Sequence, residues 1–219
     1  MNPPRRSYSP LAWALGAGVL LSFAGCNNWL AVKQKVTVDA ISAPGAPKPT
    51  GQSYRLVARK SVMNSQQAQL SVIKACVDAA LIREGLYEAP ANLPSDLFIE
   101  IAYGMDTSSR VDALYRESFL QLSARANLKH TIETTQEEQL WDVRAAINGL
   151  GGPLETAMPL LASVACKYLG ADTHVETILE VPVDSPEIKA VRESAIKTLS
   201  RTSAPATSAA ASTSSTAVK

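Results

Sequence analysis

Short segments of the chain alternate between hydrophobic and polar residues, which is the pattern of β-strands that bury one face. Six segments carry this pattern: 36–41, 54–59, 96–103, 115–128, 139–147 and 175–181. We expect each of them to form a strand. The stretch 42–51 is rich in Pro and Gly, so we expect it to be a loop between the first two strands.

Three other segments have the period of an amphipathic helix. In segment 64–84, one face carries Leu70, Ile73, Val77, Ala80 and Leu81, and Gly85 follows as a stop. Segment 153–169 begins with a proline, which suits the first turn of a helix. Its inward positions are Leu154, Met158, Leu161, Ala165 and Leu169. Segment 186–199 is a shorter amphipathic helix.

The order of these elements is β-β-α-β-β-β-α-β-α. Helices on one face of a mixed, mostly antiparallel sheet would bury the apolar stripes. The sequence therefore predicts a two-layer α+β fold in a single domain, residues 36–200. Residues 201–219 are mostly Ala, Ser and Thr, with too few large apolar side chains to offset the entropy of ordering. We expect a disordered tail there.

The N-terminal region is typical of a secretion signal. Arg5 and Arg6 precede an uncharged, largely apolar run, 11–25, which is short for a permanent membrane span. The run ends in Ala24-Gly25-Cys26, which resembles the bacterial lipobox. The resemblance implies a signal peptide at 1–25, acylation of Cys26 with chains such as palmitate, and a lipidated tether at 26–35. Two alternatives stay open: an ordinary cleaved signal that leaves a free thiol, and an uncleaved anchor.

Lipidation would place the protein in a bacterial cell envelope, bound to membrane lipid through acylated Cys26. Asn27 follows this cysteine, whereas in enterobacterial lipoproteins an Asp at that position favours the inner membrane. By resemblance to that rule, the outer membrane is favoured, with the domain facing the periplasm or the cell surface.

Composition argues against one class of partner. The net charge is +1 and aromatic residues make up 5% of the chain. Nucleic-acid binding relies on clustered Lys and Arg and on aromatic side chains that stack on bases. We therefore expect no nucleic-acid partner.

No motif of catalysis or of cofactor binding stands out. His130 and His174 have no Cys or carboxylate at ligand spacing, so we interpret both as surface residues and expect no metal site. Asp96 and Glu100 fall on the same side of one predicted strand, where exposed strand polarity explains them. Gly149, Gly151 and Gly152 precede Pro153 and suit a tight turn better than a phosphate cradle. We therefore predict no catalytic residue and no cofactor.

Two cysteines remain besides Cys26. Cys76 and Cys166 each fall at the flank of the apolar stripe of a predicted helix. An oxidising envelope favours their pairing in a disulfide, and this interpretation is preferred. The alternative is two free, buried and unreactive thiols.

Two segments resemble small envelope lipoproteins of a domain family of unknown function. They read CVDAALIREGLYEAPANLPSDLFIEIAYG and EQLWDVRAAINGLGG. The shared pattern is a helix that ends in Gly, a link with Pro, an Asp that opens an apolar strand, and a later strand with Trp. The resemblance covers about residues 36–181 and implies an α+β envelope domain without known chemistry.

These observations favour a membrane-anchored envelope lipoprotein with a structural or protein-interaction role, whose partner is another envelope protein or the cell wall. An alternative is a module that binds a small apolar ligand or lipid between sheet and helices. A hydrolase of cell wall or lipid is a third hypothesis, for which the sequence offers no supporting motif.

Overall fold

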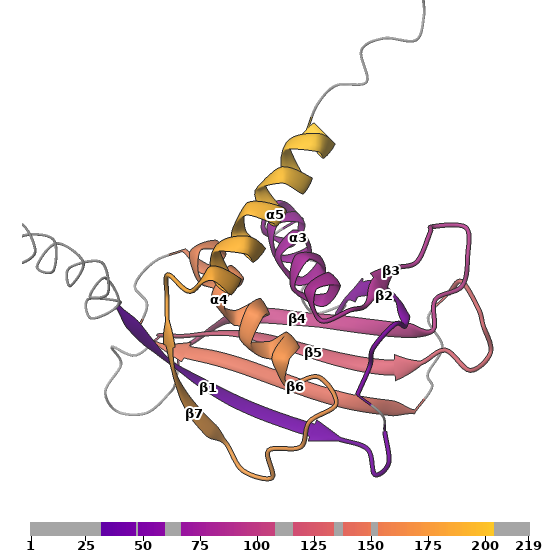
Figure 1. Ribbon diagram of the computed structural model, residues 1–219, viewed down its shortest axis with the longest axis horizontal. Coiled ribbons are helices and arrows are strands. Elements are labelled where there is room, and N and C mark those ends of the chain that lie inside the picture. The colour runs from indigo at the N-terminus through magenta and orange to yellow at the C-terminus, as the bar shows by residue number, and fades with distance from the viewer. Residues whose placement is uncertain are drawn as a thin grey trace, which may run out of the picture.

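The structure is a computed structural model that describes residues 32–46, 48–59, 67–107, 116–133, 138–149 and 153–203. The strands are β1 (Lys33–Ser42), β2 (Ser53–Ala58), β3 (Tyr87–Glu88), β4 (Leu97–Thr107), β5 (Arg116–Ala126), β6 (Gln139–Asn148) and β7 (Thr177–Pro182). The helices are α3 (Gln67–Arg83), α4 (Leu154–Lys167) and α5 (Pro186–Ser203). Within the described residues, the strands form one sheet and the helices lie on one side of it (Figure 1). The predicted α+β class is confirmed.

The sheet has the strand order β3-β2-β4-β5-β6-β1-β7. β2 pairs in parallel with β3 and with β4, and the other neighbours pair antiparallel. β1 comes first in the chain, yet it lies between β6 and β7. Val38 is thereby opposite Ala145, which is more than a hundred residues later in the sequence. The predicted mixed sheet is present, and its long-range register positions the surface described below.

The predicted element order is wrong at one point, because it lacks β3. This strand has two residues, Tyr87 and Glu88, and both side chains are exposed. A strand of that length cannot show alternation, and nothing buried marks it in the sequence. It continues the sheet beyond β2, where the Ala89 N–H donates to the Tyr54 carbonyl at 2.8 Å.

The predicted arrangement of the helices also needs correction. α4 packs over β1, β5 and β6, and α3 lies beside α4 and over β3. α5 packs mainly on α3 and α4, so it adds a tier above the helices that cover the sheet. The reason is its narrow apolar stripe, with Ile188, Val191 and Ala195 buried between polar flanks. Such a stripe fits the groove between two helices.

Both domain boundaries lie slightly outside the predicted ones. β1 begins at Lys33, so three residues assigned to the tether belong to the sheet. Their polar side chains hide the strand in the sequence, but their backbones pair with β7, with Lys33 opposite Pro182. α5 continues to Ser203, into the segment assigned to the tail. The remaining tail, 204–219, lies outside the described residues, as does 1–31.

The core lies between the sheet and the helix layer. α4 is buried along almost its whole length, including Met158, Leu161 and Ala165. The strand positions that point toward the helices are buried at every second residue, as in Val36, Val38 and Ala40 of β1. Burying one large aliphatic side chain contributes about 1.5–3 kcal/mol, so this face supplies most of the driving force for folding.

Candidate functional site: the open face of the sheet

The strand residues that alternate with the core residues form the side of the sheet opposite the helices. We call this side the open face. On β1, β5, β6 and β7 its members are Thr37, Asp39 and Ile41; Glu117, Phe119, Gln121 and Ser123; Asp142, Arg144 and Ala146; and Ile178. β4 adds Phe98 and Ala102, which are buried, as are Ser123 and Ala146. Ile41 and Ile178 are 60% and 66% exposed, so this face presents aliphatic as well as charged side chains.

A groove of about 350 Å³ runs over one end of the open face. Three strands and the segment before β7 line it: Thr37, Asp39, Glu117, Arg144, Ala146, Asn148 and Glu176. The antiparallel register creates the groove, because it places Asp39 of β1 directly opposite Arg144 of β6. Carboxylates, an amide and a guanidinium thus converge from segments that are far apart in the sequence.

Arg144 is the central side chain of the groove. Its Nη2 lies 3.3 Å from Glu117 Oε1, which forms an ion pair across β5 and β6. Its guanidinium carbon also lies 4.4 Å from the centre of the Phe119 ring, a cation–π contact. These two contacts hold the guanidinium in place over the sheet, so the groove is already ordered before anything binds.

Beside the groove, the middle of the open face carries a hydrogen-bonded polar row. The Gln121 amide nitrogen donates to both carboxylate oxygens of Asp142, at 2.9 and 3.1 Å. The Ser123 hydroxyl donates to the same carboxylate. Neighbouring strands therefore lock their own polar side chains, which leaves a fixed pattern of charge on this face.

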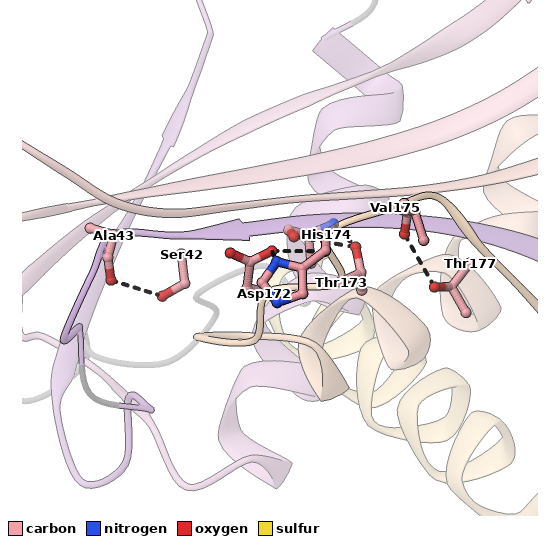
Figure 2. Close-up of polar contacts among 8 residues, drawn as sticks. Ser42, Ala43, Asp172, Thr173, His174, Val175 and Thr177 are labelled. Carbon is pink, nitrogen blue, oxygen red and sulfur yellow. Dashed lines mark hydrogen bonds and ion pairs between the residues drawn. The ribbon is translucent and has the colours of Figure 1, made fainter.

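The segment between α4 and β7 forms the rim of the groove and is shown in Figure 2. Thr173 is tied to β1, because its backbone N–H donates to the Ala40 carbonyl at 2.9 Å and its Oγ1 accepts from the Ala40 N–H at 3.0 Å. Val38 pairs with Thr177. From Ala40 to Val38 the β1 chain advances two residues, whereas the facing segment advances four residues, from Thr173 to Thr177. The extra residues of the facing segment, 174–176, therefore form a bulge, and this bulge brings Glu176 to the groove.

His174 lies at the turn of this bulge in a left-handed conformation, with φ of 56°. The Val175 N–H donates back to the Thr173 carbonyl, which makes a γ-turn around His174. Asp172 stabilises the turn: its Oδ1 accepts from the His174 backbone N–H at 2.8 Å and lies 3.1 Å from Nδ1 (Figure 2). The histidine thus has a structural partner.

The other chemically capable residues named from the sequence also have structural partners. Asp96 precedes β4 and accepts hydrogen bonds from the Ser53 N–H at 2.8 Å and the Ser53 hydroxyl at 2.7 Å. These bonds lower the pKa of Asp96 below its usual value. Glu100 pairs with Arg59 at 3.5 Å. His130, which is exposed, lies in the loop after β5 with φ of 48°, and its backbone N–H donates to the Asn127 carbonyl at 3.1 Å.

Cys26 lies outside the described residues, whereas the other two cysteines lie within them. Cys76 on α3 and Cys166 on α4 are both buried and both free, so the preferred disulfide is not formed in this structure. Burial raises the pKa of the Cys76 thiol to about 11 and raises that of Cys166 as well. The Arg192 guanidinium acts on Cys76 and the Glu84 carboxylate on Cys166, so the two thiols have different surroundings.

One polar pair at the border of the core was not expected from the sequence. The Tyr54 hydroxyl, on fully buried Tyr54, donates to Asp78 Oδ1 at 3.1 Å. Burial, and next the nearby Glu88 carboxylate, raise the pKa of Asp78 to about 6. The signal available in the sequence was an Asp directly after Val77, beside the apolar stripe of α3, but its tyrosine partner comes from a distant strand.

The open face can bind polar groups, since it offers carboxylate and amide acceptors beside a cationic donor. Within the described residues, no group of three or more His, Cys, Asp or Glu side chains is arranged to hold a metal ion. No helix in that part of the chain is long and apolar enough to cross a bilayer.

Comparison with known proteins gives little further information. No protein-family model and no curated protein sequence matches the chain. Among solved structures, the PelC dodecamer from Paraburkholderia phytofirmans has a TM-score of 0.41 and 12% identity, over 63% of this chain and 99% of that one. A variant of the same protein has a TM-score of 0.38 and 13% identity, over 62% and 98%. At these values the likeness is remote and says nothing about what this protein binds.

Proposed function

We propose that the protein is a lipid-anchored lipoprotein of a bacterial cell envelope, with a structural or protein-interaction role, and that it presents the open face to its partner. The observation that carries the interaction role is the asymmetry of the domain. One side of the sheet is packed under the helix layer, and the other carries ordered charged groups, of which Asp39 is exposed and Asp142 and Arg144 are partly exposed. Antiparallel sheets tolerate a solvated face, but this one also has exposed Ile41 and Ile178.

The anchoring part of the proposal rests on Cys26 at the end of the apolar run 11–25. Two or more acyl chains on one cysteine give stable membrane attachment, because each buried methylene contributes about 0.8 kcal/mol. Asn27 favours the outer membrane, with the domain facing the periplasm or the cell surface. The tether is then short, since the sheet starts at Lys33.

The open face suits a protein or cell-wall partner because its groups are held in place before binding. Arg144 is fixed by Glu117 and Phe119, and Asp142 by two donors on β5. Little side-chain entropy is lost when such groups are covered. Charged groups around exposed aliphatic residues also match the usual anatomy of a protein interface, in which a polar rim surrounds apolar anchors.

Site-specific photo-crosslinking in cells tests this role. Benzoylphenylalanine replaces Ile178 on the open face, and in a matched protein it replaces Ile82 on α3, which is 57% exposed. We expect a discrete protein or cell-wall adduct from position 178, none of the same mass from position 82, and loss of the adduct in a Cys26→Ser background. Equal adducts from both positions would contradict a role for the open face.

The groove favours a second candidate function, that of a binding module for a small molecule. Its lining is mostly polar and charged, so it suits a polar ligand rather than the apolar one suggested by the sequence. Native mass spectrometry of the gently purified protein tests this candidate. A small-molecule adduct that is present in the wild type and absent in Asn148→Ala would support it, and an unliganded wild-type mass would exclude it.

A further inference from the structure

Two loops lie together beyond the end of the sheet at which β1 finishes. One loop leads from β3 to β4, and the other follows β5 (Figure 1). Leu97 and Ala126 are paired at this end of β4 and β5, so residues 89–95 and 127–133 leave the sheet side by side. The start of β1, at Lys33, is at the opposite end of its strand.

The side chain of Arg55 fastens the two loops to each other. Its Nη1 donates to the Ile132 carbonyl at 2.9 Å, and its Nη2 donates to the Leu93 carbonyl at 2.6 Å. Nη2 also lies 3.0 Å from the Pro90 carbonyl. A guanidinium has a planar fork of donors, so one residue of β2 can hold backbone groups of both loops in fixed positions.

Buried Asn127 adds a second connection. Its Nδ2 donates to the Ser95 carbonyl at 2.7 Å and to the Thr131 carbonyl at 2.8 Å. Its Oδ1 accepts from the Thr131 N–H at 3.0 Å. The loop after β5 is thus closed on itself and joined to the loop before β4, which makes the pair a rigid support.

This support displays three aliphatic side chains to solvent. Leu93 is 51% exposed, Leu128 77% and Ile132 50%. We call Leu93, Leu128 and Ile132 the loop patch. Single exposed aliphatic residues are ordinary, but here Leu93 and Ile132 are held by the same guanidinium, and Leu128 belongs to the same closed loop as Ile132. Apolar side chains on rigid loops lose little entropy when a partner covers them.

The charge beside Leu128, the most exposed member of the loop patch, indicates what the partner carries at that point, whereas exposed Glu133 borders Ile132 on the other side. Exposed Lys129 follows Leu128 directly, and it makes no ion pair with the described part of the chain. Exposed His130 is next, near Asp96. An ammonium group at the rim of an apolar patch is complementary to a carboxylate on the facing surface.

The position of the loop patch relative to the anchor favours a protein over the anchoring membrane. Cys26 is seven residues before Lys33, and a fully extended chain of that length spans at most about 25 Å. β1 then carries the chain roughly 30 Å further, toward the end of the sheet where the loops lie. An upright domain therefore holds the loop patch away from the lipid surface.

We propose that the loop patch is a docking surface for an envelope protein that offers an apolar pocket bordered by a carboxylate. Leu128, the most exposed member, enters the pocket, Leu93 and Ile132 flank it, and Lys129 pairs with the carboxylate. Arg55 is a positioning residue that acts through the two loop backbones. The orientation in this inference rests on the proposed anchoring through Cys26, whereas the surface itself is distinct from the open face.

The test begins with the full-length protein in cells. Benzoylphenylalanine replaces Leu128 in one protein and Ile196 of α5, which is 60% exposed, in its control. The partner that crosslinks at position 128 is identified by mass spectrometry and purified.

The purified partner is then titrated against wild type, Leu128→Asp, Lys129→Glu and Ile196→Asp. We expect the Kd for the partner to rise at least about tenfold for Leu128→Asp and Lys129→Glu and to stay within about twofold for Ile196→Asp. All four must melt cooperatively, and reversing the partner's carboxylate to Lys should restore binding to Lys129→Glu.

Three results would overturn the docking surface. The first is an adduct at twice the mass of this chain, which would assign the loop patch to a second copy. The second is flotation with vesicles of phosphatidylethanolamine and phosphatidylglycerol that Leu128→Asp abolishes, which would assign it to a membrane. The third is equal affinity of all variants. A failure of the proposed anchoring is distinguishable, because an unmodified Cys26 would leave the Leu128-dependent affinity unchanged.

Discussion

The hydrogen-bonded pair of buried Tyr54 and half-buried Asp78 leads to a prediction about how stability depends on pH. Asp78 projects from α3 toward β2 and β3, where it meets the Tyr54 hydroxyl and the Glu88 carboxylate, while Lys74 lies nearby and pairs with Glu88 at 3.4 Å. Burial is the main reason that the pKa of Asp78 rises from 3.8 to about 6. We therefore expect Asp78→Asn, which is nearly isosteric and has no charge, to stabilise the protein at neutral pH.

The direction in which stability changes with pH follows from proton binding by Asp78 in the folded and unfolded states. Between pH 3.8 and about 6, the folded protein holds the Asp78 proton more often than the unfolded chain does. Stability from this group is therefore fully present below pH 3.8 and is lost as the pH rises through about 6. The wild type and the Asn variant should have similar stabilities at acid pH and should separate as the pH rises.

The size of the change in the free energy of unfolding follows from the size of the pKa shift of Asp78. The pKa rises by about two units, and each unit corresponds to ~1.4 kcal/mol, which sets an upper limit of roughly 3 kcal/mol. Asp78 is partly exposed, so solvent reduces this value. We expect Asp78→Asn to raise the free energy of unfolding by about 1–3 kcal/mol at pH 8, and by much less near pH 4.

Urea unfolding of the purified protein between pH 4 and 8 measures this difference. Glu193→Gln is the matched control, since it removes an exposed carboxylate from α5 and should change the free energy of unfolding by less than about 0.5 kcal/mol. An Asp78→Asn variant that is no more stable than the wild type at pH 8, or that has the same advantage at every pH, would show that ionised Asp78 does not destabilise the folded protein.

Three further predictions concern other parts of the molecule. In the folded protein, Cys76 and Cys166 should resist a thiol reagent such as dithionitrobenzoate, because burial raises the pKa of both thiols. Both should react once urea unfolds the protein without a reductant, and a lack of reaction there would instead reveal a disulfide. Gly104→Ala should lower the free energy of unfolding by about 1 kcal/mol in urea titrations, since its Cβ would lie 3.1 Å from the Phe119 ring, which the Arg144 guanidinium contacts on its face; an unchanged midpoint would contradict this. Arg55→Ala should speed amide hydrogen exchange in both loops that it fastens and leave the exchange of β6 unchanged, whereas slow exchange in the loops would show that the guanidinium is dispensable.

The elements with one buried face could be predicted from the sequence. β1 alternates because every second residue is apolar and faces the helix layer, and α4 has a full apolar stripe. The ends of these elements were predicted less accurately. Lys33 pairs through its backbone with β7, and no side-chain pattern records a backbone hydrogen bond.

The open face could not be predicted, because it depends on register between distant segments. Asp39 and Arg144 read as isolated surface charges until β1 is placed beside β6. Gln121 and Ser123 likewise become partners of Asp142 only through the pairing of β5 with β6. Local patterns indicate which side of a strand is buried, but they contain no information on which strand lies beside it.

The two cysteines show the limit of helical phase as a guide to pairing. Cys76 and Cys166 were placed at the flanks of their stripes, yet both are buried in the helix layer. α3 and α4 do pack against each other, as a disulfide would require. The surroundings of Cys76 depend on α5, which brings Arg192 close to it, and no local pattern indicates where α5 packs.

Lipid anchoring through Cys26 can be measured from the intact mass of the protein extracted from native membranes. We expect a mature chain that begins at Cys26 and carries the mass of a diacylglyceryl group, with or without a third acyl chain, and we expect this added mass to be missing in Cys26→Ser. A chain that begins elsewhere, retains the run 11–25, or carries an unmodified Cys26 would contradict the anchoring.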